Sequence, residues 1–135
     1  MSEQDNVQVV QRLLKAITEG DVSVAGQLLT DDVALTSSGP KDLLPWAGEY
    51  HGPDGVLQYW TKLSQGVELI GMEVVDIIAQ RDKVVVLGKH TGRVRTTGKS
   101  YDLNWAQVYT LREGKVASLY SYHDSYLVAE AVRGG

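Results

Sequence analysis

The stretch LNWAQVYTLREGKVASLYSYHD, residues 103–124, has the alternation that decides the fold of the chain. Apolar and polar residues take turns on both arms of this stretch, as they do on half-buried β-strands. Between the arms, Arg112-Glu113-Gly114-Lys115 has the glycine and the charges of a short exposed turn. The stretch therefore predicts two antiparallel strands, with one face of the hairpin turned toward a pocket.

Three helical patterns precede this hairpin. The first begins after Ser2, whose hydroxyl is a helix cap, and runs as one apolar stripe to Gly20, which favours a helix end. Asp21 caps a second, shorter helix. Pro53 and Asp54 open a third, at a position where the missing N–H of proline costs nothing. The helices therefore occupy the N-terminal half of the chain.

Period-two patterns and breaks divide the rest of the chain. Strands are expected over residues 31–36, 67–79 and 84–95, and a short last helix over residues 125–132. Gly71 marks a bend or bulge in the long strand. Proline and glycine break either period across residues 37–53, which are expected to form a loop. The apolar residues of this loop favour a flap over a pocket mouth, with the surface of a partner subunit as the alternative.

The order of these elements predicts an α+β fold. Helices that are separated in sequence from a long antiparallel run of strands are typical of a curved sheet that wraps around helices. We expect a cone-shaped, barrel-like fold in which three N-terminal helices pack on a curved, mostly antiparallel sheet and enclose a cavity. Residues 1–135 are expected to form a single domain, since this length leaves no room for a second.

Composition narrows the classes of function. The chain has 43% hydrophobic and 22% charged residues, no apolar run long enough to span a membrane and no signal-like start, so a cytoplasmic location is expected. The formal net charge of −4 disfavours the electropositive surface that nucleic-acid binding requires. Cysteine is absent, which excludes disulfides, thiolate metal sites and cysteine nucleophiles.

Every large aromatic residue of the chain has a polar group. There are seven Tyr, three Trp and no Phe, and such rings favour a cavity lined by hydroxyl and indole donors. Core packing is the alternative for each ring taken alone. Together with the loop, the rings predict the binding of a small hydrophobic, ring-bearing molecule. The expected ligand-binding residues are Trp46, Tyr50, Tyr59, Trp60, Trp105, Gln107 and Tyr109.

Two histidines are candidates for proton transfer, because an imidazole both accepts and donates protons near neutral pH. His90 falls on the apolar side of its strand, and His123 stands next to Asp124 at the end of the last strand. Direct pairing of His123 with Asp124 requires irregular geometry, since neighbours in a strand point to opposite faces. The alternative for each histidine is a structural role. His51 is expected to be a cap or surface residue, and no HxH or HxxxH spacing points to a metal.

Four short motifs extend across nearly the whole chain. They are Glu19-Gly20-Asp21, Leu28-Leu29-Thr30-Asp31-Asp32-Val33, Tyr50-His51-Gly52-Pro53-Asp54-Gly55-Val56 and Arg112-Glu113-Gly114-Lys115-Val116. In these motifs and in its element order, the chain resembles the nuclear transport factor 2-like (NTF2-like), or SnoaL-like, superfamily, which includes ketosteroid isomerases and polyketide cyclases. The resemblance implies the α+β cone. It does not imply one activity, because this fold is used by isomerases, cyclases, hydrolases, dehydratases and proteins without chemistry.

Carried over residue by residue, the resemblance does not supply the isomerase site. The tyrosine donor, the base aspartate and the protonated aspartate of the isomerases would fall near Leu13, Ser37 and Gln107, and none of them matches. Cyclase-type members often keep a carboxylate or histidine near the end of the last strand, where His123 and Asp124 stand. The alignment of Gln107 with an inward-facing residue of the isomerases also implies which residues of the hairpin face the cavity. These are Leu103, Trp105, Gln107, Tyr109, Leu111, Leu119, Ser121 and His123.

The sequence thus predicts a small-molecule binding protein or an acid-base enzyme of isomerase, cyclase or hydrolase type that needs no cofactor. The expected catalytic group is His90, or His123 with Asp124, while Gln107 and tyrosine hydroxyls would orient a carbonyl. The alternative is a non-catalytic ligand-binding or protein-interaction module. The resemblance also implies a homodimer, whose contacting residues would include Asn104, Ala106, Val108 and Thr110.

Overall fold

The computed structural model describes residues 2–134, which form four helices and six strands. In chain order, the elements are α1 (Glu3–Glu19), α2 (Val22–Gln27), β1 (Leu29–Ser37), β2 (Gly48–His51), α3 (Gly52–Gly66), β3 (Val67–Gln80), β4 (Lys83–Val94), β5 (Ser100–Arg112), β6 (Lys115–His123) and α4 (Ser125–Arg133). The hairpin predicted over residues 103–124 is formed by β5 and β6. Within residues 2–134, no helix has both the length and the apolar character needed to cross a membrane.

The ends of α1 and the start of α2 agree with the sequence signals. The Ser2 hydroxyl accepts a hydrogen bond from the Asp5 backbone N–H, and the Asp5 carboxylate accepts one from the Ser2 N–H, which makes a capping box. Gly20 ends α1 in the left-handed conformation, with φ at 72°, and Asp21 caps α2 through its side chain. Leu13 of α1 is fully buried. The apolar stripe of α1 is therefore part of the core.

All six strands belong to one sheet, in the order β2-β1-β6-β5-β4-β3. Strands β3 to β6 follow one another as an antiparallel meander, as expected, whereas β1 lies parallel to β6. The register of β3 shifts between Leu69 and Gly71, which confirms the bulge predicted at Gly71. Strands β4 and β5 pair without a shift, so alternate residues of each keep to one face throughout.

The loop predicted over residues 37–53 is partly wrong. Gly48–His51 forms strand β2, which pairs with β1, and α3 begins directly after it at Gly52. A strand of four residues at the edge of a sheet gives too short an alternation to be recognised among prolines and glycines. Strand β1 is also longer than residues 31–36, because pairing with β6 extends it at both ends.

The remaining part of this loop is anchored to the body of the protein. Leu44, Trp46 and Ala47 are buried, although no helix or strand contains them. The Trp46 ring lies against Gly66 at the end of α3, where a Cβ would come within 2.5 Å of it. The apolar residues of the loop therefore belong to the core.

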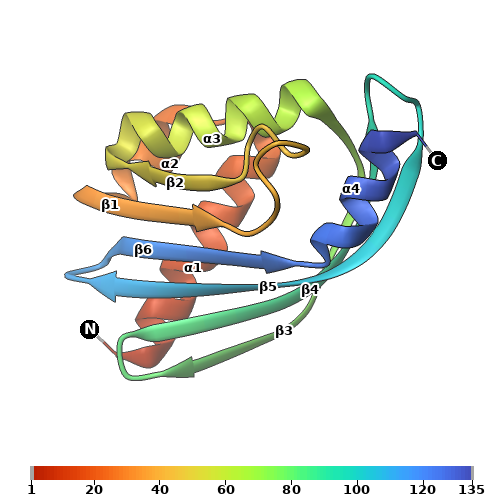
Figure 1. Ribbon diagram of the computed structural model, residues 1–135. Helices are drawn as coiled ribbons and strands as arrows, with labels where there is room; N and C mark the ends of the chain where they lie inside the picture. Colours follow the sequence, from red (N-terminus) through yellow and green to blue (C-terminus); the bar gives the residue numbers. More distant parts are fainter. Residues whose placement is uncertain (1, 135) are drawn as a thin grey trace.

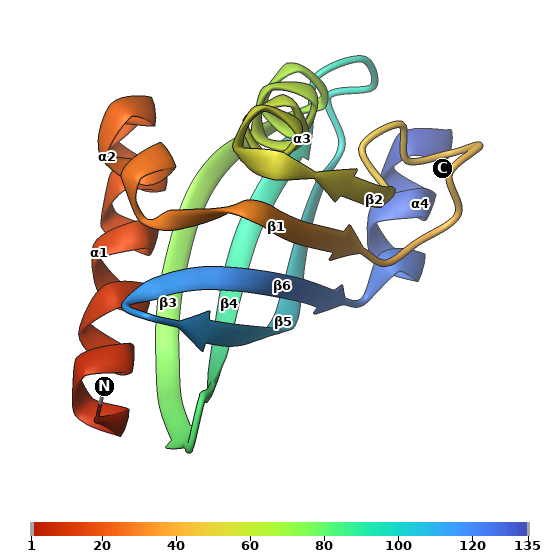
Figure 2. The ribbon, with the colours of Figure 1, turned by 90° about the vertical axis from the view of Figure 1, so that its left-hand side faces the viewer.

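The helices and the sheet form a layered, cone-like body. Helix α1 packs on β3 and β4, and α3 packs on β1 and β2. Figure 1 and Figure 2 show the sheet curving around these helices. Helix α4 lies at the end of the sheet where β6 stops, and it packs on β4 and β5 (Figure 1). This arrangement confirms the expected α+β class.

Candidate functional site

The candidate site lies on the inner face of β4 and β5, which we define as the face that carries the buried side chains of Val84, Val86 and Tyr109. Because the two strands pair without a shift, the same face presents His90 on β4 and Tyr101, Leu103, Trp105 and Gln107 on β5. On β6, pairing with β5 places Leu119, Ser121 and His123 on this face. The pairing of β4, β5 and β6 therefore agrees with the prediction that these hairpin residues share one face of the sheet.

Two aromatic rings of β5 lie across two glycines of β4. Gly88 pairs with Trp105, and Gly92 pairs with Tyr101. A Cβ at Gly88 would lie 2.2 Å from Cζ2 of Trp105, and a Cβ at Gly92 would lie 2.5 Å from the Tyr101 hydroxyl oxygen. Both distances are far shorter than the normal carbon contact of about 3.5 Å. Only glycine leaves room for these rings, and His90 stands between the two glycines on the same face.

His90 is half-buried and forms a hydrogen bond with Tyr101. Its Nε2 lies 3.3 Å from the Tyr101 hydroxyl oxygen, and the two ring centroids are 5.4 Å apart in an edge-to-face arrangement. Burial lowers the pKa of His90, and the nearby His123 lowers it further. Burial also raises the pKa of Tyr101 to about 12. Near neutral pH the pair is therefore uncharged and able to share one proton in a hydrogen bond.

His123 ends β6 and is half-buried, whereas Asp124 is exposed and is the N-cap residue of α4. Burial lowers the pKa of His123, and the charge of Asp124 opposes this shift. Among residues 2–134, no hydrogen bond or ion pair joins the two side chains, although they are neighbours in sequence. The main chain of His123 is held by Ser38, whose hydroxyl oxygen lies 3.4 Å from the His123 N. The structure thus places His123 on the same face of the sheet as His90 and leaves Asp124 in solvent.

Three hydroxyl groups meet where α3 packs on β1, next to β6. Ser37 and Ser121 are cross-strand partners, and both are buried. The Tyr59 hydroxyl of α3 lies 3.3 Å from the Ser37 hydroxyl. Burial raises the pKa of Tyr59, and the hydrogen bond with Ser37 opposes this shift. These groups are neutral hydrogen-bonding groups that can orient a ligand oxygen but cannot act as strong bases.

The residues predicted to line an aromatic cage fall into separate groups. Trp46, Tyr50 and Tyr59 lie together, with the rings of Tyr50 and Tyr59 at 5.3 Å and the Tyr50 hydroxyl donating to the Trp46 carbonyl at 2.8 Å. Trp60 is partly buried against the core. Trp105 lies across Gly88, two residues from His90 on β4. Contact of these residues with a ligand stays a prediction.

Gln107 and Tyr109 bond to each other on the inner face of β5. The Tyr109 hydroxyl donates to Oε1 of Gln107 at 2.5 Å, and burial strongly raises the pKa of Tyr109. This bond uses the amide oxygen of Gln107, so its NH₂ group is the part that could donate to a ligand carbonyl. His51, by contrast, is exposed and makes no side-chain cap bond at the start of α3.

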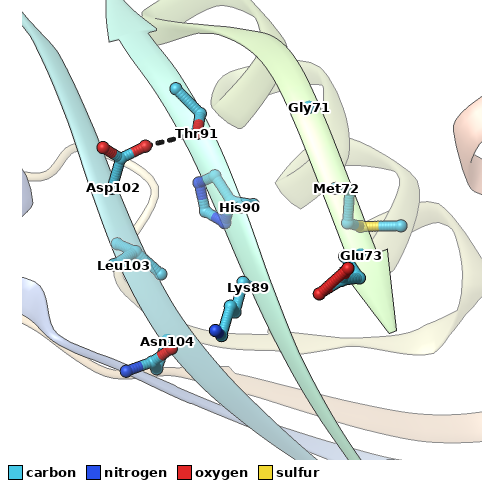
Figure 3. A pocket seen from close by; sticks show the side chains of 9 residues that line it. All are labelled: Gly71, Met72, Glu73, Lys89, His90, Thr91, Asp102, Leu103 and Asn104. Carbon is cyan, nitrogen blue, oxygen red and sulfur yellow. Dashed lines mark hydrogen bonds between the residues drawn. The ribbon is translucent and has the colours of Figure 1, made fainter. Parts of the chain in front are cut away.

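Two adjoining grooves, of ≈ 500 Å³ and ≈ 470 Å³, lie along β3, β4 and β5 and share Lys89 and Asn104; the second also reaches β6. Figure 3 shows the residues of the first groove in rows on three neighbouring strands, with the hydrogen bond between Thr91 and Asp102. Strand alternation puts Lys89, Thr91, Asp102 and Asn104 on the outer face, which is the face opposite His90. The polar part of the first groove therefore belongs to the outer face. Within the described chain, no cluster of three or more His, Asp or Glu side chains could hold a metal.

Sequence reasoning missed Tyr101 as a site residue. The signal was present, because Tyr101 precedes Leu103 and Trp105 in the same alternation on β5. The expected strand at residue 103 started too late to include it. Without the pairing of β4 with β5, the contact of Tyr101 with His90 could not be seen.

The curved sheet, the helices on its inner face and the histidine, hydroxyl and ring side chains gathered there define an α+β cone protein. Residues 10–119 match the SnoaL-like domain. The chain belongs to the SnoaL-like domain family, which confirms the resemblance carried by the four motifs. None of the curated proteins compared with the chain matches it.

Solved structures of the same fold include an NTF2-like protein from Burkholderia xenovorans LB400, which is 31% identical, with a TM-score of 0.90 and 98% of each chain covered. TerC, crystallised with polyporic acid, is 19% identical, with a TM-score of 0.81, covering 96% of this chain and 98% of its own. A candidate SnoaL-like polyketide cyclase from Jannaschia sp. CCS1 is 20% identical, with a TM-score of 0.83 and coverages of 98% and 94%. The last two likenesses concern the fold alone.

Proposed function

We propose that this protein binds a small hydrophobic molecule on the inner face of its sheet and acts on it by acid-base chemistry, as an isomerase, cyclase or hydrolase without a cofactor. His90 or His123 is the proton-transfer group in this proposal, and Gln107 and tyrosine hydroxyls orient a carbonyl of the ligand. Residues 1–135 would act as one domain.

The single observation that supports this proposal best is the environment of His90. A half-buried imidazole stands between the two glycines against which Trp105 and Tyr101 lie, with a neutral phenol at its Nε2. Burial lowers the pKa of both His90 and His123, which keeps the two imidazoles neutral and able to accept a proton near neutral pH. Titratable groups with shifted pKa values on an apolar face are typical of functional sites. The co-crystal of TerC with polyporic acid is consistent with ligand binding by this fold.

The proposal is tested with a ligand identified from the protein itself. Native mass spectrometry of the purified protein should reveal a co-purified apolar molecule, whose conversion is then followed with wild type, His90→Asn and His123→Asn. At least one of these variants should lose roughly 100-fold or more in rate, the usual contribution of a general acid or base. His51→Asn is the matched control, because His51 is exposed. Unchanged rates in both site variants would remove the acid-base proposal and leave ligand binding.

A second candidate function is a dimeric interaction module, and the outer face of the sheet favours it. On this face, Val108 pairs with Val85 and Tyr120, and Ala106 pairs with Leu87 and Tyr122. Tyr120 and Tyr122 are stacked, with ring centroids 4.2 Å apart, and they are 40% and 48% exposed. Exposed apolar patches of this kind mark interaction sites. Polar Asn104 and Thr110 border the patch, so the expected dimer contacts form one continuous surface.

The homodimer is proposed to bury this outer face, with the two grooves closed by the second copy. Sedimentation velocity at micromolar concentration should give a dimer for the wild type and a monomer for Val108→Lys, because two buried like charges would face each other across a two-fold axis. Gln11→Lys is the control, since Gln11 is exposed on α1. A monomeric wild type would contradict the proposal.

A further inference from the structure

The two inner-face histidines differ in what holds them, and this difference assigns them different roles. We propose that Tyr101 is a positioning residue that fixes the neutral His90 with its proton on Nδ1, so that His90 is a hydrogen-bond donor to the ligand and His123 is the proton acceptor. This inference rests on the acid-base function proposed above. It adds a division of labour between the histidines and a residue that the sequence did not indicate.

The first step is that the Tyr101 hydroxyl lies in packed surroundings beside His90. The Tyr101 ring lies across Gly92, with its hydroxyl oxygen so close to the glycine that a Cβ there would be 2.5 Å from it. The same Cβ would lie 2.9 Å from Cγ1 of Val67, the first residue of β3. An apolar group therefore borders the Tyr101 hydroxyl. Tyr101 is only 9% exposed. The buried ring therefore holds its hydroxyl beside Nε2 of His90, at 3.3 Å.

The second step decides which group donates. A buried hydroxyl that leaves its proton without an acceptor loses free energy, so such groups are nearly always paired. Within the described chain, Nε2 of His90 is the hydrogen-bond partner of the Tyr101 hydroxyl. If Nε2 held the ring proton, the phenol proton would have no acceptor among the side chains and backbone of residues 2–134. The phenol therefore donates to Nε2, and the neutral imidazole has its proton on Nδ1.

The third step concerns Nδ1 itself. Among residues 2–134, Nδ1 of His90 has no hydrogen-bond partner in the protein. The only buried side-chain nitrogen or oxygen without a partner in this part of the chain is Oδ1 of Asn6, so Nδ1 of His90 is not buried. Nδ1 therefore reaches solvent-accessible space, where a ligand oxygen could accept its hydrogen. A fixed N–H donor of this kind stabilises the negative charge that develops on a carbonyl oxygen.

His123 has the opposite character. Its side chain makes no hydrogen bond within residues 2–134, so neither ring nitrogen is committed to a protein donor. Burial lowers its pKa, which keeps the imidazole neutral and able to take a proton. An imidazole with a free lone pair suits the proton acceptor, whereas the Nε2 lone pair of His90 is already occupied by Tyr101.

The groups that face His90 do not disturb this assignment. Tyr101 faces it from β5 and His123 from β6, and Met72 is its partner on β3. The charged side chains of neighbouring positions, Lys89 and Asp102, point to the outer face. Burial and the neighbouring His123 lower the pKa of His90, which keeps its imidazole neutral and able to accept from the phenol near neutral pH.

Histidine-selective ¹⁵N labelling and NMR test the assignment without any ligand. At about pH 8, above the ordinary histidine pKa, His90 should show a protonated Nδ1 and an unprotonated Nε2, with roughly a tenfold excess of this tautomer. His90→Asn identifies its signals by their loss. A predominant Nε2–H form in the wild type would overturn the proposal.

Tyr101→Phe is the decisive variant because it removes only the hydroxyl. The excess of the Nδ1–H tautomer should fall several-fold. Tyr109→Phe is the matched control, since that hydroxyl bonds to Gln107 on the same strand; it should leave the His90 tautomer unchanged. An unchanged tautomer in Tyr101→Phe would also refute the proposal. Failure of the proposed function is read separately, from unchanged turnover in the histidine variants.

Discussion

Gly88→Ala should destabilise the protein by about 2 kcal/mol, because this glycine is the space in which Trp105 lies. The new Cβ would be 2.2 Å from Cζ2 and 2.5 Å from Cε2 of the indole, and 2.7 Å from the backbone oxygen of Glu73 on β3. Reaching a normal carbon contact of about 3.5 Å requires a shift of about 1.3 Å. Trp105 is only 7% exposed, so its ring cannot turn into solvent without losing its packing.

The magnitude combines two opposing effects. Overpacking of a core costs about 1–3 kcal/mol, and the upper end applies because a backbone oxygen lies on the other side of the methyl group. Replacing glycine by alanine within a strand returns about 0.5–1 kcal/mol of backbone entropy. The net loss of about 2 kcal/mol corresponds to a fall in Tm of about 6 °C for a domain of this size.

Thermal and urea unfolding followed by circular dichroism measure this loss. Gly71→Ala is the matched control in β3, because no atom lies within 4 Å of its added Cβ; it should be neutral or slightly stabilising. In a Trp105→Ala background, the indole is gone and most of the cost of Gly88→Ala should disappear. Equal costs in both backgrounds, or a Gly88→Ala protein as stable as Gly71→Ala, would show that the glycine does not make room for the ring.

Three further predictions concern stability. Leu13→Ala, which empties a fully buried position of α1, should cost about 3 kcal/mol in urea unfolding, and a loss below about 1 kcal/mol would contradict the packing of α1 on the sheet. Ser2→Ala, which removes the capping box, should cost about 1 kcal/mol, while Ser2→Asp should retain most of the stability. Because burial depresses the folded-state pKa of His90 and His123, the unfolded chain binds more protons than the folded protein below about pH 6.5, so Tm should be level above that pH and fall below it. The double variant His90→Asn/His123→Asn should reduce this fall, and an unchanged pH profile would contradict the buried, neutral state of the two imidazoles.

Local signals determined much of the fold. The capping box at Ser2 and the glycine at position 20 set the limits of α1, because each acts within one turn of helix. The alternation in residues 103–124 was enough to predict the β5–β6 hairpin, and the glycine at position 71 to predict the bulge. Strand β2 and the parallel pairing of β1 with β6 could not be predicted, since both depend on contacts between segments far apart in sequence.

The candidate site, like the fold, was predicted in part from the sequence and completed only by the tertiary structure. The sequence by itself determined that His90 lies on the apolar face of its strand and that His123 ends the last strand, because a period of two fixes which neighbours share a face. Only the tertiary structure decided which strands are adjacent. The pairing of β4 with β5 sets Trp105 over Gly88 and Tyr101 over Gly92, and thereby gives His90 its hydrogen-bond partner. Periodicity describes one strand at a time, whereas the partner of a side chain depends on the register between two strands.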